Sequence, residues 1–359
     1  ETESNAPATV SERRGLGLSG LAGLVAIISV FLTWGNNAGL LSGHVRSADL
    51  DLGGQSFGGL EASGGNWIGF FVLGLGVFIV LAAGTILRRP ETETRWLTPA
   101  GSVIAAIAMI VVVLTYLMWR PATGTVDYSN GVGVYVALVA GILATIGSMH
   151  ALWTAPYVSH RPLRQKVAWS RFAAGVFAVI VIGIGAISGW TFDQRQSDNL
   201  TNQQQWEVDM LMEDAKINPS KAALNNSKIA SIINKARRTN LIVLDGLRDE
   251  GGGLGRLAIP VGIIGALLAL PAAGVFGLDE HLRWRWSAVV AGVGMGLILL
   301  ALSWVASLAR VTDNKIVTGA GVFLTLLGGL AILSSSRSIL GEFTRRKVYS
   351  DAVVDQVTT

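Results

Sequence analysis

Eight long apolar stretches constrain this chain more than any other feature, because they determine which solvent can surround the folded protein. Each is about 19 to 24 residues long, and a helix of that length crosses a hydrocarbon core of about 30 Å at 1.5 Å per residue. The sequence therefore predicts an all-α polytopic membrane protein with eight transmembrane helices. The stretches cover residues 16–34, 67–87, 97–119, 131–153, 172–190, 257–277, 286–309 and 316–335.

Charged residues are few and are segregated from these stretches. They make up 14% of the 359 residues, whereas about 25% is usual for a soluble domain. Within the eight stretches the only Asp, Glu, Lys, Arg or His is His150. This distribution predicts that the lipid bilayer is the principal partner of the chain.

The basic residues predict the orientation of the chain in the membrane. If the amino terminus is cytoplasmic, the inner short segments carry 15 Lys and Arg residues and the outer short loops carry 4. Such a bias follows the positive-inside rule. We therefore expect a multi-pass protein of the plasma membrane with both termini in the cytoplasm. The pI near 9.5 is explained by this topology, so we expect no nucleic-acid partner.

The stretches form two similar sets of four. Residues 131–135 (GVGVY) and 319–323 (GAGVF) open the fourth and eighth stretches with an offset of 188, and the same offset relates Trp96 to Trp284. Trp34 and Trp190 end the first stretch of each set. We interpret the sets as tandem repeats of equal topology, related by an axis along the membrane normal. The expected parts are a cytoplasmic tail (1–15), a first four-helix repeat (16–154), a cytoplasmic linker (155–171), a second four-helix repeat (172–340) and a basic cytoplasmic tail (341–359).

Small residues recur at intervals of four or eight along several stretches. This spacing places them on one helix face, where they allow a neighbouring backbone to approach closely. Helix packing is the expected role, and a narrow path lined by small residues is the alternative. The candidates are Gly133, Ala137 and Gly141, then Gly292 and Gly296, and finally Gly321 and Gly329.

The outer segments differ between the two repeats. In the first, residues 48–52 alternate apolar and acidic side chains and residues 55–57 follow a Gly-Gly pair, which predicts a short strand pair. In the second, residues 191–256 are expected to contain a helical hairpin. Its first helix covers 201–216, and its second runs from Asn218-Pro219 to about Arg248.

Charge along this hairpin supports antiparallel pairing of its helices. Residues 193–214 contain six acids and one base, whereas residues 216–238 contain six bases and no acid. The hairpin is interpreted either as a solvated connector or as a docking surface for an extracytoplasmic protein partner. Trp206, Arg237 and Arg238 are the candidate contact residues.

The motifs of the common enzyme classes are absent from the sequence. No glycine-rich loop ends in Gly-Lys-Ser or Gly-Lys-Thr, cysteine is absent, and the four histidines are scattered. Nothing resembles a catalytic triad, so we expect no enzyme activity, no cofactor and no metal site. The scarcity of ionisable residues within the stretches also argues against an ion-coupled carrier.

Two functions remain open at this stage. The first is a permease-like membrane component that moves a small or lipidic solute with energy supplied by a partner. The second is a non-transporting accessory or scaffold subunit of a membrane complex, which docks partners through the outer hairpin. The first is slightly favoured on the frequency of transport among proteins with eight membrane helices, which is an association and not a mechanism.

The four-helix unit with strands in its first outer loop resembles in layout the tetraspan proteins of the claudin type. The cysteine pair and tryptophan motif of that family are missing, since the chain contains no cysteine. The resemblance therefore covers topology alone and assigns no residue a role.

Overall fold

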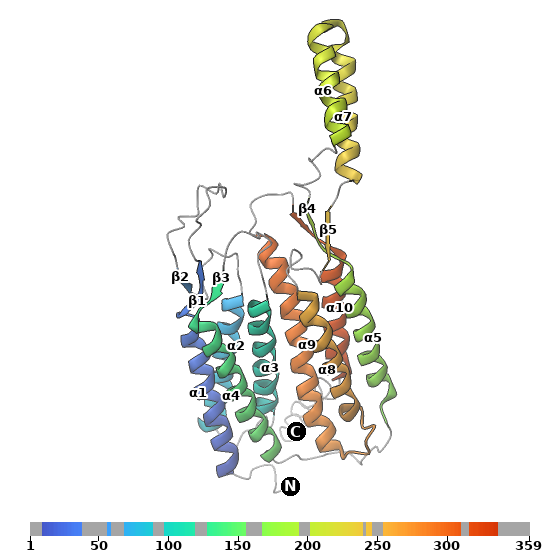
Figure 1. The fold of residues 1–359 in the computed structure, drawn as a ribbon. Helices are drawn as coiled ribbons and strands as arrows, with labels where there is room; N and C mark the ends of the chain where they lie inside the picture. The colour runs from blue at the N-terminus through green and yellow to red at the C-terminus, as the bar shows by residue number, and fades with distance from the viewer. Residues whose placement is uncertain are drawn as a thin grey trace, which may run out of the picture.

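The computed structural model describes residues 9–37, 56–58, 68–88, 97–118, 128–155, 167–193, 202–239, 242–245, 254–309 and 316–336. These residues are mostly helical (Figure 1). The helices are α1 (Val10–Ser29), α2 (Ile68–Arg88), α3 (Leu97–Met118), α4 (Val132–Thr154), α5 (Trp169–Ile187), α6 (Asn202–Ile217), α7 (Ala222–Thr239), α8 (Leu254–Ala273), α9 (Glu280–Ala309) and α10 (Ala320–Ser335). The strands are β1 (Thr33–Asn37), β2 (Ser56–Gly58), β3 (Tyr128–Asn130), β4 (Gly189–Asp193), β5 (Ile242–Asp245) and β6 (Ile316–Thr318).

Six of the described helices are long and apolar enough to cross a membrane, namely α2, α3, α4, α5, α8 and α9. This confirms the mostly helical architecture and indicates contact with a lipid bilayer. Two other helices within the predicted stretches, α1 and α10, are not both long enough and apolar enough to be counted with these six. α1 carries Glu12, Arg13 and Arg14 in its first turns. α10 has only 16 residues, which is about 24 Å at 1.5 Å per residue.

The bundle helices expose apolar side chains on the faces that point away from their neighbours. On α5, Gly175, Ala178 and Ile182 are buried, whereas Phe177 and Ile180 are more than half exposed. A helix in water presents polar residues on its outer face, so an apolar outer face indicates that lipid surrounds the bundle.

The ends of several predicted elements are wrong, because β-structure replaces helix there. The first stretch leaves the helical conformation after Ser29, and Thr33–Asn37 forms β1. The eighth stretch begins as β6, and α10 starts only at Ala320. α7 ends at Thr239, so the helix predicted through about Arg248 is too long. Ile242–Asp245 forms β5 instead, where two successive β-branched residues favour a strand.

The strand pair predicted in the first outer loop is partly correct. Ser56–Gly58 is a strand, β2, close to the predicted second member. Its antiparallel partner is β1, and the predicted first member, residues 48–52, lies outside the described residues.

The bundle helices form two groups of four that lie side by side (Figure 1). In one group, α1 contacts α2 and α4, and α3 contacts the same two helices. In the other, α5 contacts α8 and α10, and α9 contacts the same two helices. The groups meet along α3 and α9.

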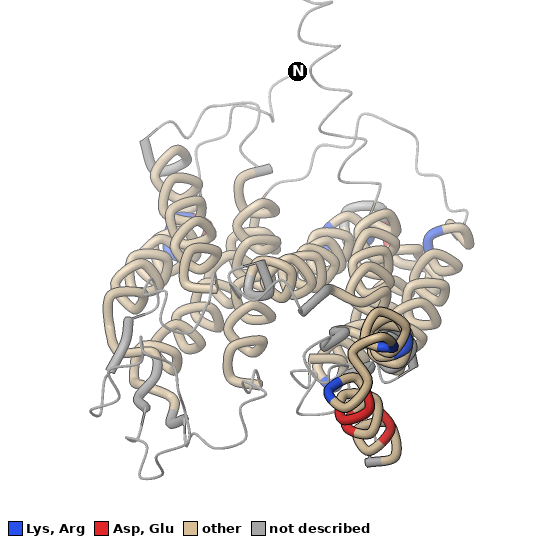
Figure 2. The backbone as a smooth tube through the Cα atoms, turned by 90° about the horizontal axis from the view of Figure 1, so that it is seen from above, with Lys and Arg blue, Asp and Glu red and all other residues tan. Residues whose placement is uncertain are grey.

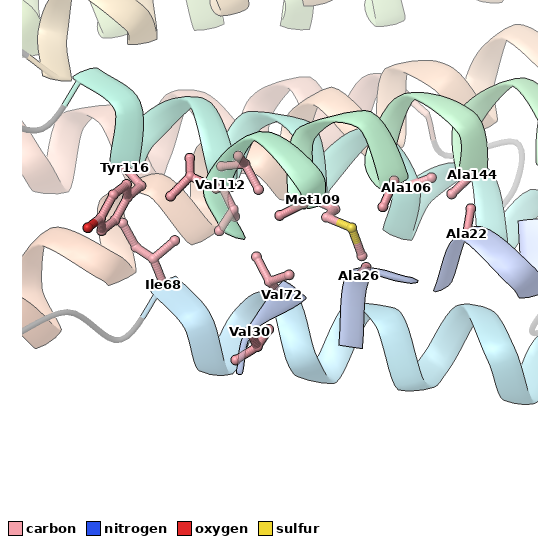
Figure 3. Close-up of a cluster of buried hydrophobic side chains, with 14 of the residues drawn as sticks. Ala22, Ala26, Val30, Ile68, Val72, Ala106, Met109, Val112, Tyr116 and Ala144 are labelled. Carbon is pink, nitrogen blue, oxygen red and sulfur yellow. The ribbon is translucent and has the colours of Figure 1, made fainter. Parts of the chain in front are cut away.

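The core of the first group is filled by small and medium-sized apolar side chains. Met109 of α3 lies among Ala22 and Ala26 of α1 and Val72 of α2, all of them buried (Figure 3). The alanines bring the helix axes close together, and Met109 fills the space that they leave.

A three-stranded antiparallel sheet lies at the same end of each group (Figure 1). The strand orders are β2-β1-β3 and β5-β4-β6. Each central strand directly follows the first helix of its group and has a register shift at its start, between Thr33 and Gly35 in β1 and between Gly189 and Thr191 in β4. Such a register shift arises when one strand contains an extra residue, which bends that strand locally. Here the bend lies where the chain turns from helix into sheet.

Candidate interaction sites

Two buried tryptophans attach the sheets to the bundles. Trp34 in β1 and Trp190 in β4 are almost completely buried. The indole Nε1 of Trp34 donates a hydrogen bond of 2.7 Å to the carbonyl of Ser29, and that of Trp190 donates one of 2.8 Å to the carbonyl of Gly185. Each acceptor belongs to the last turns of the preceding helix, where carbonyl groups have no intrahelical partner. The indoles therefore tie each central strand to its helix.

The same tryptophans contact an aromatic residue on a neighbouring helix. Trp34 meets Tyr116 of α3 edge to face, with ring centroids 5.1 Å apart. Trp190 meets Trp304 of α9 in the same manner at 6.1 Å. These aromatic contacts were not predicted from the sequence, although the offset of 188 that relates the two sets of stretches also relates Tyr116 to Trp304.

Glycines allow the last helix of each group to press against its tryptophan. The amide nitrogens of Gly131 and Gly319 donate hydrogen bonds of 2.7 Å to the carbonyls of Trp34 and Trp190. Two residues further on, a Cβ added at Gly133 would lie 2.6 Å from the Trp34 ring, and one added at Gly321 would lie 2.6 Å from the Trp190 ring. Both distances are far below van der Waals contact, so only glycine fits.

Two other predicted packing glycines lie where the two helix groups meet. A Cβ at Gly292 of α9 would be 2.8 Å from the Cβ of Ile107 on α3, and one at Gly296 would be 2.7 Å from the Cβ of Val111. The α9 stripe therefore packs against the other group of helices.

The remaining predicted packing residues lie inside their own groups. Ala137 is fully buried in the first core. A Cβ at Gly141 would be 3.0 Å from the side chain of Ile110, and one at Gly329 would be 3.0 Å from that of Ile298.

The opposite end of the interface between the groups carries an arginine. Arg285 of α9 donates a hydrogen bond of 3.2 Å from its guanidinium to the carbonyl of Ala155, which follows α4. Its guanidinium carbon lies 5.9 Å from the centre of the Trp153 ring, and Trp153 meets Trp286 edge to face. A cation beside the carbonyl end of a helix is favourable, so Arg285 joins α9 to the end of α4.

Buried hydroxyl groups of the bundle helices bond mainly within their own helices. The hydroxyls of Thr115, Ser303 and Thr325 each donate to a carbonyl three or four residues earlier, over 2.7 to 3.0 Å. The Ser19 and Ser148 hydroxyls pair with each other between α1 and α4 at 2.7 Å. The hydroxyl protons of Thr115, Ser303 and Thr325 are therefore already donated to protein carbonyls.

Charges in the described bundle helices occur only near helix ends. Among the residues that the structure describes, no three His, Cys, Asp or Glu side chains gather as metal ligands.

Helices α6 and α7 project beyond the sheets, away from the bundles (Figure 1). They pack side by side around Val208 and Ile229 and are joined by a 3₁₀ turn, Pro219–Lys221. The buried Asn225 of α7 donates from Nδ2 to a carboxylate oxygen of Asp214 over 2.9 Å and to the carbonyl of Leu211 over 3.3 Å. These bonds fix the register of the two helices.

Asp214 is the centre of this polar contact. The amide of Asn218 donates to its other carboxylate oxygen over 2.8 Å. The hydrogen bonds from Asn225 and Asn218, with a smaller contribution from Lys221 and Lys228, lower the pKa of Asp214 below its ordinary value of 3.8. The carboxylate is therefore held in its charged form.

The predicted contact residue Trp206 lies on the outer side of α6, with 65% of its surface exposed. Met210 is 50% exposed and Ile217 is 71% exposed on the same helix. We call these three residues the α6 face. Acidic residues accompany them, and Figure 2 shows a group of acidic residues on this projecting element. Arg237 and Arg238 belong to α7, and their side chains lie outside the described part of the chain.

Comparisons with known proteins identify no relative. No family model, no curated protein and no solved structure matches this chain.

Proposed function

We propose that this protein is a non-transporting accessory or scaffold subunit of a membrane complex, and that α6 and α7 dock a protein partner outside the lipid. The observation that carries the proposal is the α6 face. Trp206, Met210 and Ile217 are at least half exposed on an element that extends beyond the bundles. A large exposed aromatic residue with apolar neighbours is typical of an interaction surface.

The packing of the bundles supports this choice between the two functions. The surface where the two groups meet includes the apolar side chains of Ile107 and Val111 of α3, which lie against α9. Gly292 and Gly296 bring the backbones into close contact there. A solute path needs polar groups that can replace water, and the buried hydroxyls of Thr115 and Ser303 already bond to their own helices.

We further infer that α1 and α10 cross the membrane with the six longer helices, which makes eight crossings in two tandem repeats. Three correspondences support the duplication. The pattern of helix contacts is the same in both groups when α1 is matched to α5, α2 to α8, α3 to α9 and α4 to α10. The strand orders correspond, and so do the bonds that Trp34 and Trp190 make to the preceding helix.

The proposed repeats also predict which end of the bundles faces each side of the membrane. Because the sheets and α6–α7 lie at one end, they would share the outer side of the plasma membrane, and residues 9 and 336 would share the cytoplasmic side. In this arrangement the short helix α10, about 24 Å long, would be accommodated by local thinning of the bilayer.

Transport driven by a partner protein is the competing proposal, and a flux assay separates the two. The protein would be purified with its native partners, reconstituted into liposomes and supplied with ATP. Solute movement above that of protein-free liposomes would support the permease.

Photo-cross-linking tests the docking function directly. A photoreactive residue at Met210, in native membranes, should cross-link a discrete protein partner, whereas one at the buried Val208 should not. If neither position yields a cross-linked partner, the docking function is wrong.

A further inference from the structure

We propose that the partner contacts the α6 face with a basic amphipathic helix, in which apolar residues are flanked by Lys or Arg. This inference rests on the proposed docking function, since it names the class of partner that occupies the same surface.

The geometry of the α6 face fits a helix laid along it. Trp206, Met210 and Ile217 are separated by four and seven residues. At about 100° per residue they lie within about 40° of one another around α6. They cover about 16 Å along the helix axis, which is three turns. Val208, which packs against α7, lies on the opposite side of α6. The face is therefore presented away from α7.

The acidic residues around the α6 face favour a partner with positive charge. Glu207 and Asp209 lie on the two sides of the stripe, and Glu213 lies within it between Met210 and Ile217. All three are exposed. Lys216, at the end of the helix, is the only base in α6. An incoming helix with Lys or Arg beside its apolar residues would meet opposite charge on both sides, which favours association and orients it.

The same charges disfavour a second copy of α6 as the occupant. If two copies met about an axis along the membrane normal, Glu213 would face its own counterpart. In an antiparallel pair, Glu207 and Asp214 would lie along the same flank as their counterparts. Like charges that face each other across an interface weaken it. An anionic lipid surface is disfavoured for the same reason, because acidic side chains are repelled from it.

The first experiment measures binding of two model peptides to the full-length protein in phosphatidylcholine nanodiscs. One peptide of about 18 residues has leucine at helical spacing and lysine elsewhere, and the other has glutamate in place of lysine. Both carry a fluorophore, and anisotropy is corrected with empty nanodiscs. We expect the lysine peptide to bind at least about 10-fold more tightly, with affinity falling as salt rises from about 0.05 to about 0.5 M. Equal binding of the two peptides, or no binding of either, would overturn the proposal.

The second experiment assigns the binding to the α6 face. Trp206→Ala should weaken binding of the lysine peptide at least about 10-fold, as an aromatic anchor does. Glu207→Gln combined with Glu213→Gln should weaken it and reduce its dependence on salt. Leu224→Ala, which removes an exposed apolar residue of α7, is the matched control and should leave binding unchanged. Undiminished binding to Trp206→Ala would place the peptide elsewhere and refute the inference.

Two outcomes distinguish this inference from the docking function on which it rests. If the partner cross-linked at Met210 has an acidic or uncharged contact segment, the docking function stands and the inference fails. If the purified protein forms dimers that Trp206→Ala abolishes, a second copy is the occupant, and the inference fails as well.

Discussion

The contact between Gly133 and Trp34 gives the sharpest test of how the sheets are attached. In Gly133→Ala the added methyl carbon would lie 2.6 Å from the Trp34 ring, 2.8 Å from the carbonyl oxygen of Ser29 and 2.9 Å from that of Thr33. Carbon and oxygen atoms normally approach to no less than about 3.3 Å. Because two of the three atoms belong to the backbone, α4 must move by about 0.5 Å, which is expected to cost about 1–3 kcal/mol as overpacking does.

The measurement is thermal unfolding of the purified protein in detergent, followed by loss of helical circular dichroism. A loss of 1 kcal/mol lowers the midpoint by about 2–4 °C in a domain of 150–250 residues, so Gly133→Ala should melt several degrees lower. Gly321→Ala should behave alike, since its methyl carbon would meet the carbonyl oxygen of Gly185 and the Trp190 ring.

Gly17→Ala is the matched control for this test. Gly17 lies in α1 with no atom within 4 Å of an added Cβ. Alanine is favoured over glycine within a helix, so this variant should melt at the same temperature or slightly higher. If Gly133→Ala and Gly17→Ala melt at the same temperature, the close packing of α4 on Trp34 does not hold in the folded protein.

Three further predictions concern other contacts. Trp190→Phe keeps an aromatic ring but loses the bond to the carbonyl of Gly185, so it should cost about 0.5–1.5 kcal/mol in the same melting assay; an unchanged midpoint would show that this bond contributes nothing. Gly296→Val would force side-chain atoms into Val111 of α3 and should separate the two helix groups, detected as faster proteolysis than in the control Gly183→Val, whose site is open. Asp214 has a lowered pKa in the folded protein, so its stabilisation of α6–α7 is present above the unfolded pKa and is lost as pH falls through the folded value. The protection of α6 amides, taken as measured exchange relative to intrinsic exchange at the same pH, should therefore fall below about pH 4 in the natural protein and much less in Asp214→Asn. An equal fall in both would refute this role.

The differences between sequence-based prediction and structure lie at the ends of elements. Apolar composition marks residues 16–34 as one stretch, yet the chain turns into β1 after Ser29 because Trp34 bonds back to the helix end and β1 pairs with β2 and β3. A hydropathy pattern contains no information about such pairing, since strand partners come from distant parts of the chain. Likewise, a helix was predicted from Asn218-Pro219 to about Arg248, whereas pairing with β4 makes residues 242–245 a strand.

In the candidate sites, too, some residues could be selected from the sequence and others only from the structure. Trp206 could be selected from the sequence because an aromatic residue in a polar, charged helix is unusual, and the structure finds it exposed. Met210 and Ile217 were not selected, because their exposure depends on which face of α6 packs against α7. Helical spacing alone placed Gly292 and Gly296 on one face, but only the folded chain shows that this face meets Ile107 and Val111.

The amino-acid sequence by itself determined that this protein is mostly helical and has helices that can cross a membrane, because the cost of placing charge and unpaired backbone in lipid acts on each segment separately. Which helix lies against which, where the strands form and which side chains remain exposed were decided by the tertiary structure. These features depend on contacts between residues far apart in the chain, such as Trp34 with Tyr116 and Trp190 with Trp304. Local composition determines whether a segment is surrounded by lipid or by water. Which other segments it contacts is determined only when all segments pack together.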